Sequence, residues 1–357
     1  MVAPSVRTAD GTVIGPDGKI LFFSAERFAR DICEGSCCFI CGAARGAKIF
    51  NDEHILPDWI LRRYKLHGHV IELPNGRTHQ YGTYTIPCCE DCNSFLGREL
   101  ETPLSEVFAG GRQSVANHLL AEGPHRLFTW MALVFLKIHL KDATLRAYAN
   151  FQDGDASIAT AANYRWEAFH HLHCLARSIY TGATVAPEAY GTLFLLPAGG
   201  DGTREPFDLI DLSEAQTLVI RMDDFALCAV FDDACAVLHG LDKLTRELKG
   251  PLSFPQVREF AAHLACCNMH LQNRPEFWTR VEDGDPPRVI IGGTHEATPV
   301  FAERDKKMFG GFMERVLGEL LPKLDKPGRK PEELSRLLTA GDLSFIFDDN
   351  GNFIKSA

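Results

Sequence analysis

The side chains whose types and spacing most suggest chemistry lie between residues 38 and 101. They comprise two Cys-x2-Cys pairs, a Glu-His dipeptide and an asparagine directly after the last cysteine: Cys38, Cys41, Cys89, Cys92, Glu53, His54 and Asn93. Thiolates select zinc, whereas carboxylate and amide oxygens suit a hard cation such as magnesium or manganese. The stretch therefore predicts one structural metal and, beside it, one reactive site.

The four paired cysteines suit a structural zinc ion. Such a site takes four ligands in a tetrahedron, and a gap of two residues lets both sulfurs of a pair face one ion. Four thiolates leave no open position on zinc, so the ion would hold the shape of the module. Cys37 and Cys88 adjoin the pairs, which leaves a Cys-x3-Cys register as an alternative. The two-residue spacing is preferred on geometry. A metal site is also preferred over the interpretation that these are unrelated buried cysteines.

The reactive site is predicted from Glu53, His54 and Asn93. A carboxylate and an amide oxygen can hold one magnesium or manganese ion. The imidazole beside that ion can take a proton from water as general base. The cation would hold a scissile phosphate and stabilise the leaving oxygen. Together these groups predict one-metal hydrolysis of a phosphodiester bond.

The same stretch resembles the HNH endonucleases of the zinc-bound ββα-metal type (His-Me finger, treble clef). The matching residues, in order, are Cys38-x2-Cys41, Glu53-His54-x-x-Pro57 and Cys89-x2-Cys92-Asn93. The resemblance covers about residues 33–105 and implies an endonuclease that cuts DNA. It places His54 as the general base, Glu53 as the acidic metal ligand and Asn93 as the final metal ligand.

Two positions depart from the family pattern. Tyr84 stands where the family usually has a middle asparagine, which commonly braces the loop and the base. Glu53 replaces the commoner aspartate and moves the carboxylate outward by one methylene. Glu99 or Glu101 on the following helix could add a metal ligand, although a solvated helix acid is the simpler interpretation.

Other candidate sites are weaker. His170, His171, His173 and Cys174 form a tract that could bind metal, but packed or surface histidines are the simpler interpretation. Six basic side chains near the module could contact phosphates or form a solvated face: Arg45, Lys48, Arg62, Arg63, Lys65 and Arg77. The other cysteines lack ligand spacing and are expected to be buried small hydrophobic residues.

Several elements must position the site. Apolar residues at helical spacing predict a helix over 55–66, and Asn75-Gly76 predicts a hairpin or loop within 67–83. A helix is expected from Ser94 to Glu101, directly after the second cysteine pair. Residues 113–142 are predicted to be helical, with an apolar face that includes Trp130.

The whole chain predicts an α+β fold in four parts. Residues 1–32 form an N-terminal hairpin and helix, and 33–105 form the HNH nuclease-like zinc module. Residues 106–142 form a helical connector. Residues 143–357 form an α+β domain of unknown fold, which would recognise the target, regulate cleavage or mediate assembly. Strands are predicted near 192–196, 217–222, 225–231 and 288–291, helices over 233–248 and 254–272, and a linker over 326–331.

Composition limits the class of protein. The chain has 357 residues, of which 45% are hydrophobic and 24% charged, as in ordinary globular proteins. No secretory signal and no membrane-spanning run is found, so a cytoplasmic protein with reduced thiols is expected. A net charge of −10 counts mildly against nucleic acid as a partner.

Two functions remain in competition. The first is a DNA endonuclease, with RNA not excluded and an activator or protein partner bound through 143–357. The family context would place it in bacterial antiviral defence or restriction. The second is a non-catalytic zinc module that binds nucleic acid or a protein. Retention of Glu53, His54 and Asn93 favours the first, because a structural zinc knuckle needs none of them.

Overall fold

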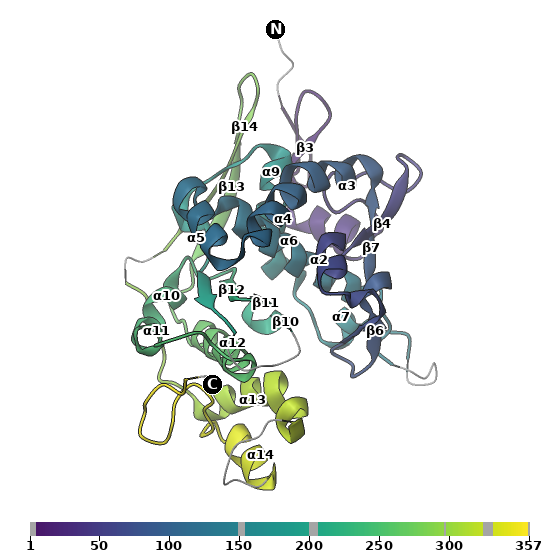
Figure 1. The fold of residues 1–357 in the computed structure, drawn as a ribbon. Coiled ribbons are helices and arrows are strands. Elements are labelled where there is room, and N and C mark those ends of the chain that lie inside the picture. Colours follow the sequence, from purple (N-terminus) through teal and green to yellow (C-terminus); the bar gives the residue numbers. More distant parts are fainter. Residues whose placement is uncertain (1–4, 149–153, 200–205, 296–297, 324–330, 356–357) are drawn as a thin grey trace. The chain divides into compact units, whose positions relative to one another are not determined.

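The computed structural model describes residues 5–148, 154–199, 206–295, 298–323 and 331–355 of a mixed α/β protein with several small sheets (Figure 1). Contacts between Cα atoms divide the chain into two units that alternate along the sequence. Unit 1 comprises Met1–Val107, His125–Ala189 and Phe277–Gly292, and unit 2 comprises Phe108–Pro124, Tyr190–Glu276 and Gly293–Ala357. The segment expected to be a connector, 106–142, is thus divided: residues 108–124 belong to unit 2 and the rest to unit 1.

Unit 1 begins with a three-stranded antiparallel sheet of β1 (Val6–Arg7), β2 (Val13–Ile14) and β3 (Ile20–Phe22). Its two turns contain Gly11 and Gly18, whose φ angles of 87° and 82° favour glycine. Ser24 then caps α1 (Ala25–Arg27), because its side chain accepts a hydrogen bond from the Arg27 amide. A π-helical segment, Phe28–Cys33, leads to the first cysteine pair.

The centre of unit 1 is an antiparallel strand pair followed at once by a helix. β4 (Phe50–His54) pairs with β7 (Thr85–Cys89), with Glu53 opposite Ile86. The helix α3 (Glu90–Leu96) starts directly after β7 and continues through a π-helical turn, Gly97–Glu101, into α4 (Thr102–Ala109). The predicted helix after the second cysteine pair is therefore present and begins four residues earlier than expected.

Between β4 and β7 the chain forms a short helix and a hairpin. The helix α2 (Asp58–Arg63) is shorter than the predicted 55–66. Its start follows Pro57, which disfavours helical backbone at the preceding residue, and it ends before Lys65, whose φ is 56°. The hairpin expected around Asn75-Gly76 is formed by β5 (Val70–Glu72) and β6 (Thr78–Gln80).

The long helix α6 (His125–Asp142) is the core of unit 1, and almost all of its side chains are buried. It packs against α8 (His170–Ala176) and contacts β7 and α7 (Ile158–Ala161). Unit 1 also contains α9 (Ser178–Thr181) and a sheet in which β14 (Arg288–Thr294) lies between β13 (Glu276–Glu282) and β8 (Thr184–Val185). Among the described residues, no helix has the length and apolar character needed to span a membrane.

Unit 2 is built on a four-stranded antiparallel sheet in the order β10-β11-β12-β9. The strands are β9 (Leu193–Pro197), β10 (Phe207–Leu212), β11 (Thr217–Met222) and β12 (Phe225–Val230). Three of them, β9, β11 and β12, are predicted from their apolar runs, and Asp223-Asp224 joins β11 to β12.

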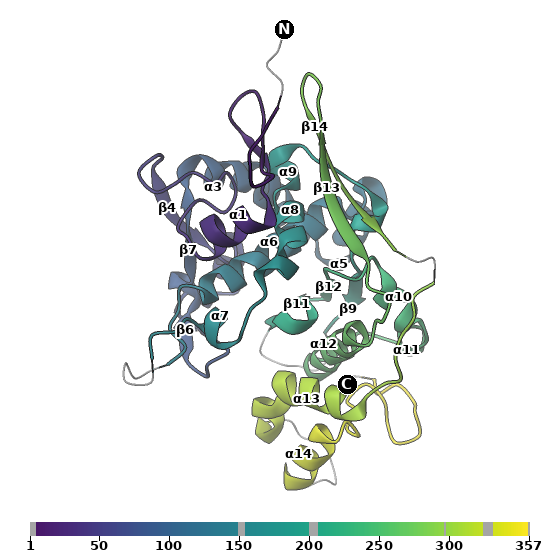
Figure 2. The ribbon, with the colours of Figure 1, turned by 180° about the vertical axis from the view of Figure 1, so that it is seen from behind.

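Helices cover this sheet and complete a separate core. α12 (Phe254–Met269) contacts both the sheet and α13 (Lys306–Leu317), as Figure 2 shows. The other helices of unit 2 are α5 (Gly111–Glu122), α10 (Ala236–Gly240), α11 (Asp242–Glu247) and α14 (Pro331–Thr339). Most of the predicted linker, 326–331, lies outside the described residues.

Candidate metal centre and active site

The four cysteines with two-residue spacing come together in unit 1. The sulfur atoms of Cys38, Cys41, Cys89 and Cys92 lie within 4.8 Å of one another. Four sulfurs bound to one zinc ion at about 2.3 Å would lie about 3.8 Å apart. The cluster could therefore hold a metal such as zinc. Among the described residues, it is the one group of His, Cys, Asp and Glu side chains close enough to do so.

The neighbouring cysteines settle the register. The Cys88 sulfur lies 3.8 Å from the Cys38 sulfur but is not one of the four that converge. Hydrogen bonds among these thiols lower the pKa of Cys38 and, through the same contacts, raise the pKa values of Cys41 and Cys92. The choice of the four ligands therefore rests on the convergence of their sulfur atoms.

Two buried cationic or polar side chains from α8 and its C-terminal cap fix the first cysteine pair. Arg177 donates from Nε to the Ile40 carbonyl at 2.6 Å and from Nη2 to the Ile20 carbonyl. The Nε2 of His173 lies 2.8 Å from the Phe39 carbonyl. The carbonyls of Phe39 and Ile40 lie between Cys38 and Cys41, so Arg177 and His173 set the path of the backbone that carries the two sulfurs.

The histidine tract is therefore part of the packing. His170 and His171 also lie within hydrogen-bond distance of backbone carbonyls, those of Phe23 and Ala189. Burial lowers the pKa of His173 well below its ordinary value, which keeps the ring neutral. No metal group forms on this tract within the described part of the chain.

His54 ends β4 and is partly exposed. Its Nε2 lies 3.3 Å from the Gly82 carbonyl oxygen, which can only accept a hydrogen bond. A neutral ring that donates from Nε2 carries its lone pair on Nδ1. A Cβ at Gly82 would lie 2.8 Å from the His67 carbonyl oxygen, so a glycine is needed for this close approach. The ring of His54 is thus oriented by backbone.

Tyr84 stands where the family usually has the middle asparagine, and its side chain is buried. It is 2% exposed, and its ring centroid lies 5.3 Å from that of His79. The Tyr84 carbonyl accepts a hydrogen bond from the Ile55 amide, directly after His54. Tyr84 therefore belongs to the core beneath the strand pair, and the carbonyl of Gly82 makes the contact with the imidazole.

Glu53 is buried and already has a cationic partner. The ammonium of Lys137, on α6, lies 2.7 Å from Glu53 Oε1 and donates to the His54 carbonyl at 2.6 Å. Lys137 is 0% exposed. Burial lowers its pKa, but the carboxylates of Glu53 and Glu101 outweigh burial, and the pKa is raised. Lys137 therefore stays charged between these groups.

Glu101 completes this buried cluster. Its Oε1 lies 3.8 Å from the Lys137 ammonium, too far for a hydrogen bond. That oxygen is buried and has no hydrogen-bond partner within the described residues. Burial raises the pKa of Glu101 to about 7; the Lys137 charge lowers it and the Glu53 charge raises it. The cluster of Glu53, Glu101 and Lys137 is called the Glu-Lys-Glu cluster below.

Asn93 lies on α3 and faces β4. Its Nδ2 donates to the Asn51 side-chain oxygen at 2.9 Å. Asn51 and Glu53 are two residues apart on a strand, so their side chains point to the same side. The sequence-predicted ligands Glu53 and Asn93 therefore address one side of β4, and His54 comes from the other.

Glu53 and Asn93 offer a carboxylate and an amide oxygen to a magnesium or manganese ion. Carboxylate and amide oxygens are the right atom types. However, Glu53 Oε1 is bonded to an ammonium, and two cations cannot share that position without strong repulsion. In this conformation the residues do not fit a divalent cation on Glu53.

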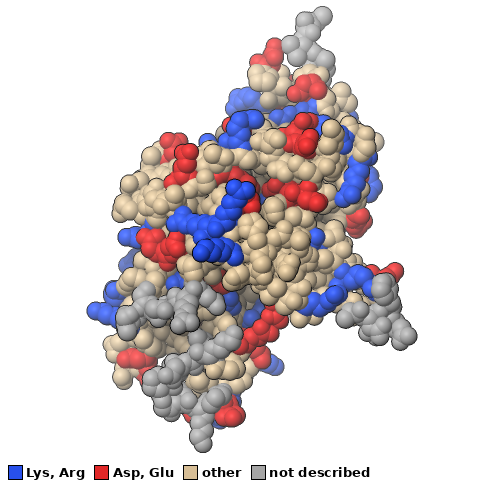
Figure 3. Space-filling model, turned by 45° about the vertical axis from the view of Figure 1, so that its right-hand side comes forward, with Lys and Arg blue, Asp and Glu red and all other residues tan. Residues whose placement is uncertain are grey.

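The candidate phosphate contacts are all exposed and partly neutralised. Arg62 pairs with Asp58 at 2.6 Å, and Lys48 pairs with Asp91 at 2.9 Å. In the face drawn in Figure 3, basic side chains occur in small groups among acidic ones. These residues could contact phosphate only as scattered charges.

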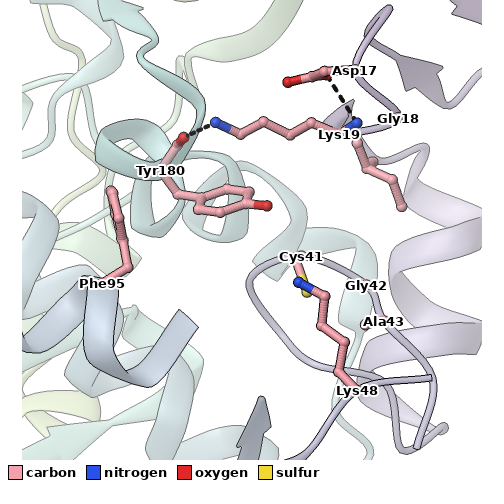
Figure 4. Close-up of a pocket in the computed structure, with 10 residues that line it drawn as sticks. Asp17, Gly18, Lys19, Cys41, Gly42, Ala43, Lys48, Phe95 and Tyr180 are labelled. Carbon is pink, nitrogen blue, oxygen red and sulfur yellow. Dashed lines mark hydrogen bonds between the residues drawn. The ribbon is translucent and has the colours of Figure 1, made fainter. Parts of the chain in front are cut away.

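A cavity of about 630 Å³ lies beside Cys41 in unit 1. Lys19, Lys48, Phe95 and Tyr180 are among the residues that line it (Figure 4). The Lys19 ammonium lies 4.2 Å from the Tyr180 ring centroid and donates to the Tyr180 carbonyl. Glu53, His54 and Asn93 are not among the lining residues, so the cavity is separate from the candidate reactive site.

Sequence reasoning missed Lys137. The signal was present, because a lysine stood inside the apolar run of the predicted helix over 113–142. Lysines are almost never fully buried unless they are paired, so its position predicts an acidic partner. The partner itself could not be identified, because Glu53 is 84 residues away in the chain.

A scan against protein-family models, a search of curated proteins and a search of solved structures each found no match to this chain.

Proposed function

We propose that unit 1 is an endonuclease of the HNH type that hydrolyses phosphodiester bonds in DNA. The observation that carries the proposal is the orientation of His54. Its Nε2 contacts the Gly82 carbonyl, so the lone pair on Nδ1 is available to a water molecule. A residue that only filled space would need neither partial exposure nor a fixed tautomer.

The surrounding elements support the same proposal. Two antiparallel strands, β4 and β7, lead directly into α3, and the four-cysteine cluster includes the end of β7 and the first turn of α3. This strand-strand-helix order is the one that the HNH resemblance implies. A zinc ion on the four cysteines would fix these elements, and His54 would take the proton from the attacking water.

The experiment is cleavage of supercoiled plasmid by the zinc-loaded full chain with magnesium, with manganese or with chelator. His54→Ala is compared with wild type, and His69→Ala, an exposed histidine of the same unit, is the matched control. Removal of a general base typically slows cleavage by about 10²–10⁴-fold. Equal cleavage by wild type and His54→Ala would remove His54 from the mechanism. A single-stranded RNA substrate in parallel separates the two nucleic acids.

A second candidate function is a non-catalytic zinc module that binds nucleic acid or a protein. The pairing of Glu53 with Lys137 favours it, because Glu53 then serves as a structural ion-pair partner. This function predicts plasmid binding in a gel-shift assay without nicking in any metal. Nicking that depends on His54 would exclude it.

A further inference from the structure

Cys41 differs from the other three cysteines of the cluster in its access to solvent. Cys38, Cys89 and Cys92 are at most 2% exposed, whereas Cys41 is partly exposed. Cys41 also lines the cavity of about 630 Å³, and the other three do not. That cavity has many times the volume of one water molecule. A small polar solute can therefore reach one sulfur of the cluster without any opening of the fold.

Two ammonium groups make the surroundings of Cys41 electropositive. Lys19 and Lys48 line the same cavity (Figure 4). The hydrogen bond to Asp91 raises the pKa of Lys48, and the thiolate charges of Cys41 and Cys89 raise it further. A thiol bound to a metal ion is deprotonated, and reactive cysteines lie in partly exposed, electropositive surroundings. Cys41 has both features when zinc is bound.

A second sulfur lies next to Cys41. The Cys89 sulfur is 3.6 Å away, and Cys89 is itself fully buried. Sulfurs in a disulfide are about 2.05 Å apart, so a small approach of the two atoms would allow the bond to form. The other close pair, Cys38 and Cys88 at 3.8 Å, consists of two fully buried residues that a solute cannot reach.

We propose that Cys41 is a redox modification site, where a peroxide that enters through the cavity forms a Cys41–Cys89 disulfide and so opens the zinc site. Only Cys38 and Cys92 then remain as ligands, too few for the tetrahedron of a structural zinc ion. Lys48 is a positioning residue, because its charge favours the approach of an electron-rich oxidant to the thiolate. The proposal goes beyond the proposed function and does not depend on it.

The chemistry takes two steps and one molecule of hydrogen peroxide. The Cys41 thiolate attacks one peroxide oxygen: a sulfur–oxygen bond forms, the oxygen–oxygen bond breaks, and hydroxide leaves. Cys41 is oxidised by two electrons to sulfenic acid, and the peroxide is reduced. The Cys89 thiolate then attacks the Cys41 sulfur, which forms the disulfide and releases a second hydroxide. Two protons from solvent convert both hydroxides to water.

The experiment treats the reduced, zinc-loaded full chain with hydrogen peroxide in the presence of a chromogenic zinc chelator. Wild type is compared with Cys41→His and Cys92→His, whose zinc content is measured first. Histidine replaces a thiolate as zinc ligand and leaves a Cys3His site, but it offers no sulfur to the oxidant. Cys92→His is the matched control, because it changes a buried ligand and keeps Cys41.

We expect wild type and Cys92→His to release zinc at similar rates, and Cys41→His to release it about ten-fold more slowly. Mass spectrometry of the alkylated wild type should show the Cys41–Cys89 disulfide, and a reductant with added zinc should reverse it. Equal rates in wild type and Cys41→His would overturn the proposal. Retention of zinc by wild type in excess peroxide would overturn it as well.

A second measurement does not need a histidine variant to hold zinc. Dimedone traps sulfenic acid, so wild type treated with less than one equivalent of peroxide should carry its first adduct on Cys41. A first adduct on any other cysteine would overturn the proposal. Lys48→Met should slow adduct formation by about 3–10-fold, with Lys65→Met, an exposed change in the same unit, as its control. Equal rates in both variants would overturn the role of Lys48. No readout uses nucleic acid, so this proposal and the proposed function can fail separately.

Discussion

The four-cysteine cluster and the Glu-Lys-Glu cluster each take one residue from the β4–β7 strand pair, Cys89 and Glu53, but they balance charge in opposite ways. In the first, four sulfur ligands within 4.8 Å of one another include no cationic side chain. In the second, two carboxylates enclose a lysine that the chain supplies itself. The first cluster thus offers its four sulfurs to an external ion that it could hold, whereas the second has a cation of its own. A set of metal-type ligands is therefore not evidence for a second metal until the protein's own cations are located.

The largest expected effect is that of removing the metal from the four cysteines. Binding of structural zinc supplies folding free energy of about 10 kcal/mol or more in small zinc modules. We expect a strong chelator, or Cys89→Ser, to expose the amides of β4, β7 and α3 to hydrogen exchange. The β9–β12 sheet of unit 2, which has its own apolar core, should stay protected. Hydrogen exchange with mass spectrometry measures both regions at once.

Cys37→Ser is the control, because Cys37 adjoins the cluster but is not one of the four. If β4 and β7 stayed fully protected after chelation, the four-cysteine cluster would not need an ion, and the contrast with the Glu-Lys-Glu cluster would be wrong.

The second effect is that of removing the resident cation. Breaking a buried ion pair by deleting one partner costs about 3–5 kcal/mol, because a buried charge is left alone. We expect Lys137→Ala to lower the free energy of unfolding of unit 1 by that amount in urea titration. Adding Glu53→Gln should restore part of the loss, because the carboxylate that was bonded to the ammonium is then neutral. Strict additivity of the two changes would contradict direct coupling.

Local elements could be predicted because they depend on nearby residues. The strands of the unit 2 sheet follow from apolar runs, the hairpin at 70–80 follows from Asn75-Gly76, and the two-residue spacing identifies the cysteine pairs. Helix limits were less accurate where one residue changed the backbone. Pro57 delays α2, and the left-handed conformation of Lys65 follows its end.

The contacts that decide the chemistry could not be predicted because they join distant residues. Lys137 reaches Glu53 across 84 positions, and Arg177 reaches Ile40 across 137. No local pattern encodes such a pairing. The same holds for His54, whose partner is a backbone carbonyl and therefore has no side-chain signal. The roles of His54, Glu53 and Asn93 in catalysis stay predictions.

A smaller effect is expected from the side chain that supports the first cysteine pair. Arg177 is fully buried and donates to the Ile40 carbonyl, between Cys38 and Cys41. Mutations of residues that orient metal ligands typically weaken metal affinity by about 10–100-fold. We expect Arg177→Met to weaken zinc binding by this factor in competition with a chromogenic chelator. Arg63→Met, an exposed change on α2, is the control, and equal zinc affinity in both variants would limit Arg177 to packing.

The smallest effect is a dependence of stability on pH that comes from Glu101. The folded protein holds a proton on this carboxyl up to about pH 7, because burial raises its pKa from an ordinary 4.5. The unfolded chain releases the proton near pH 4.5. Between these values the folded state binds more protons, so its contribution to stability is present at low pH and is lost as pH rises.

Glu101→Gln cannot lose a proton, so it should flatten this slope. We expect the difference in unfolding free energy between wild type and Glu101→Gln to change by about 1–3 kcal/mol from pH 4.5 to pH 7. Urea titrations at several pH values measure it, with Glu99→Gln as the control on the same helical turn. An identical pH profile in both proteins would show that Glu101 releases its proton in the folded state at the same pH as in the unfolded chain, in spite of its burial.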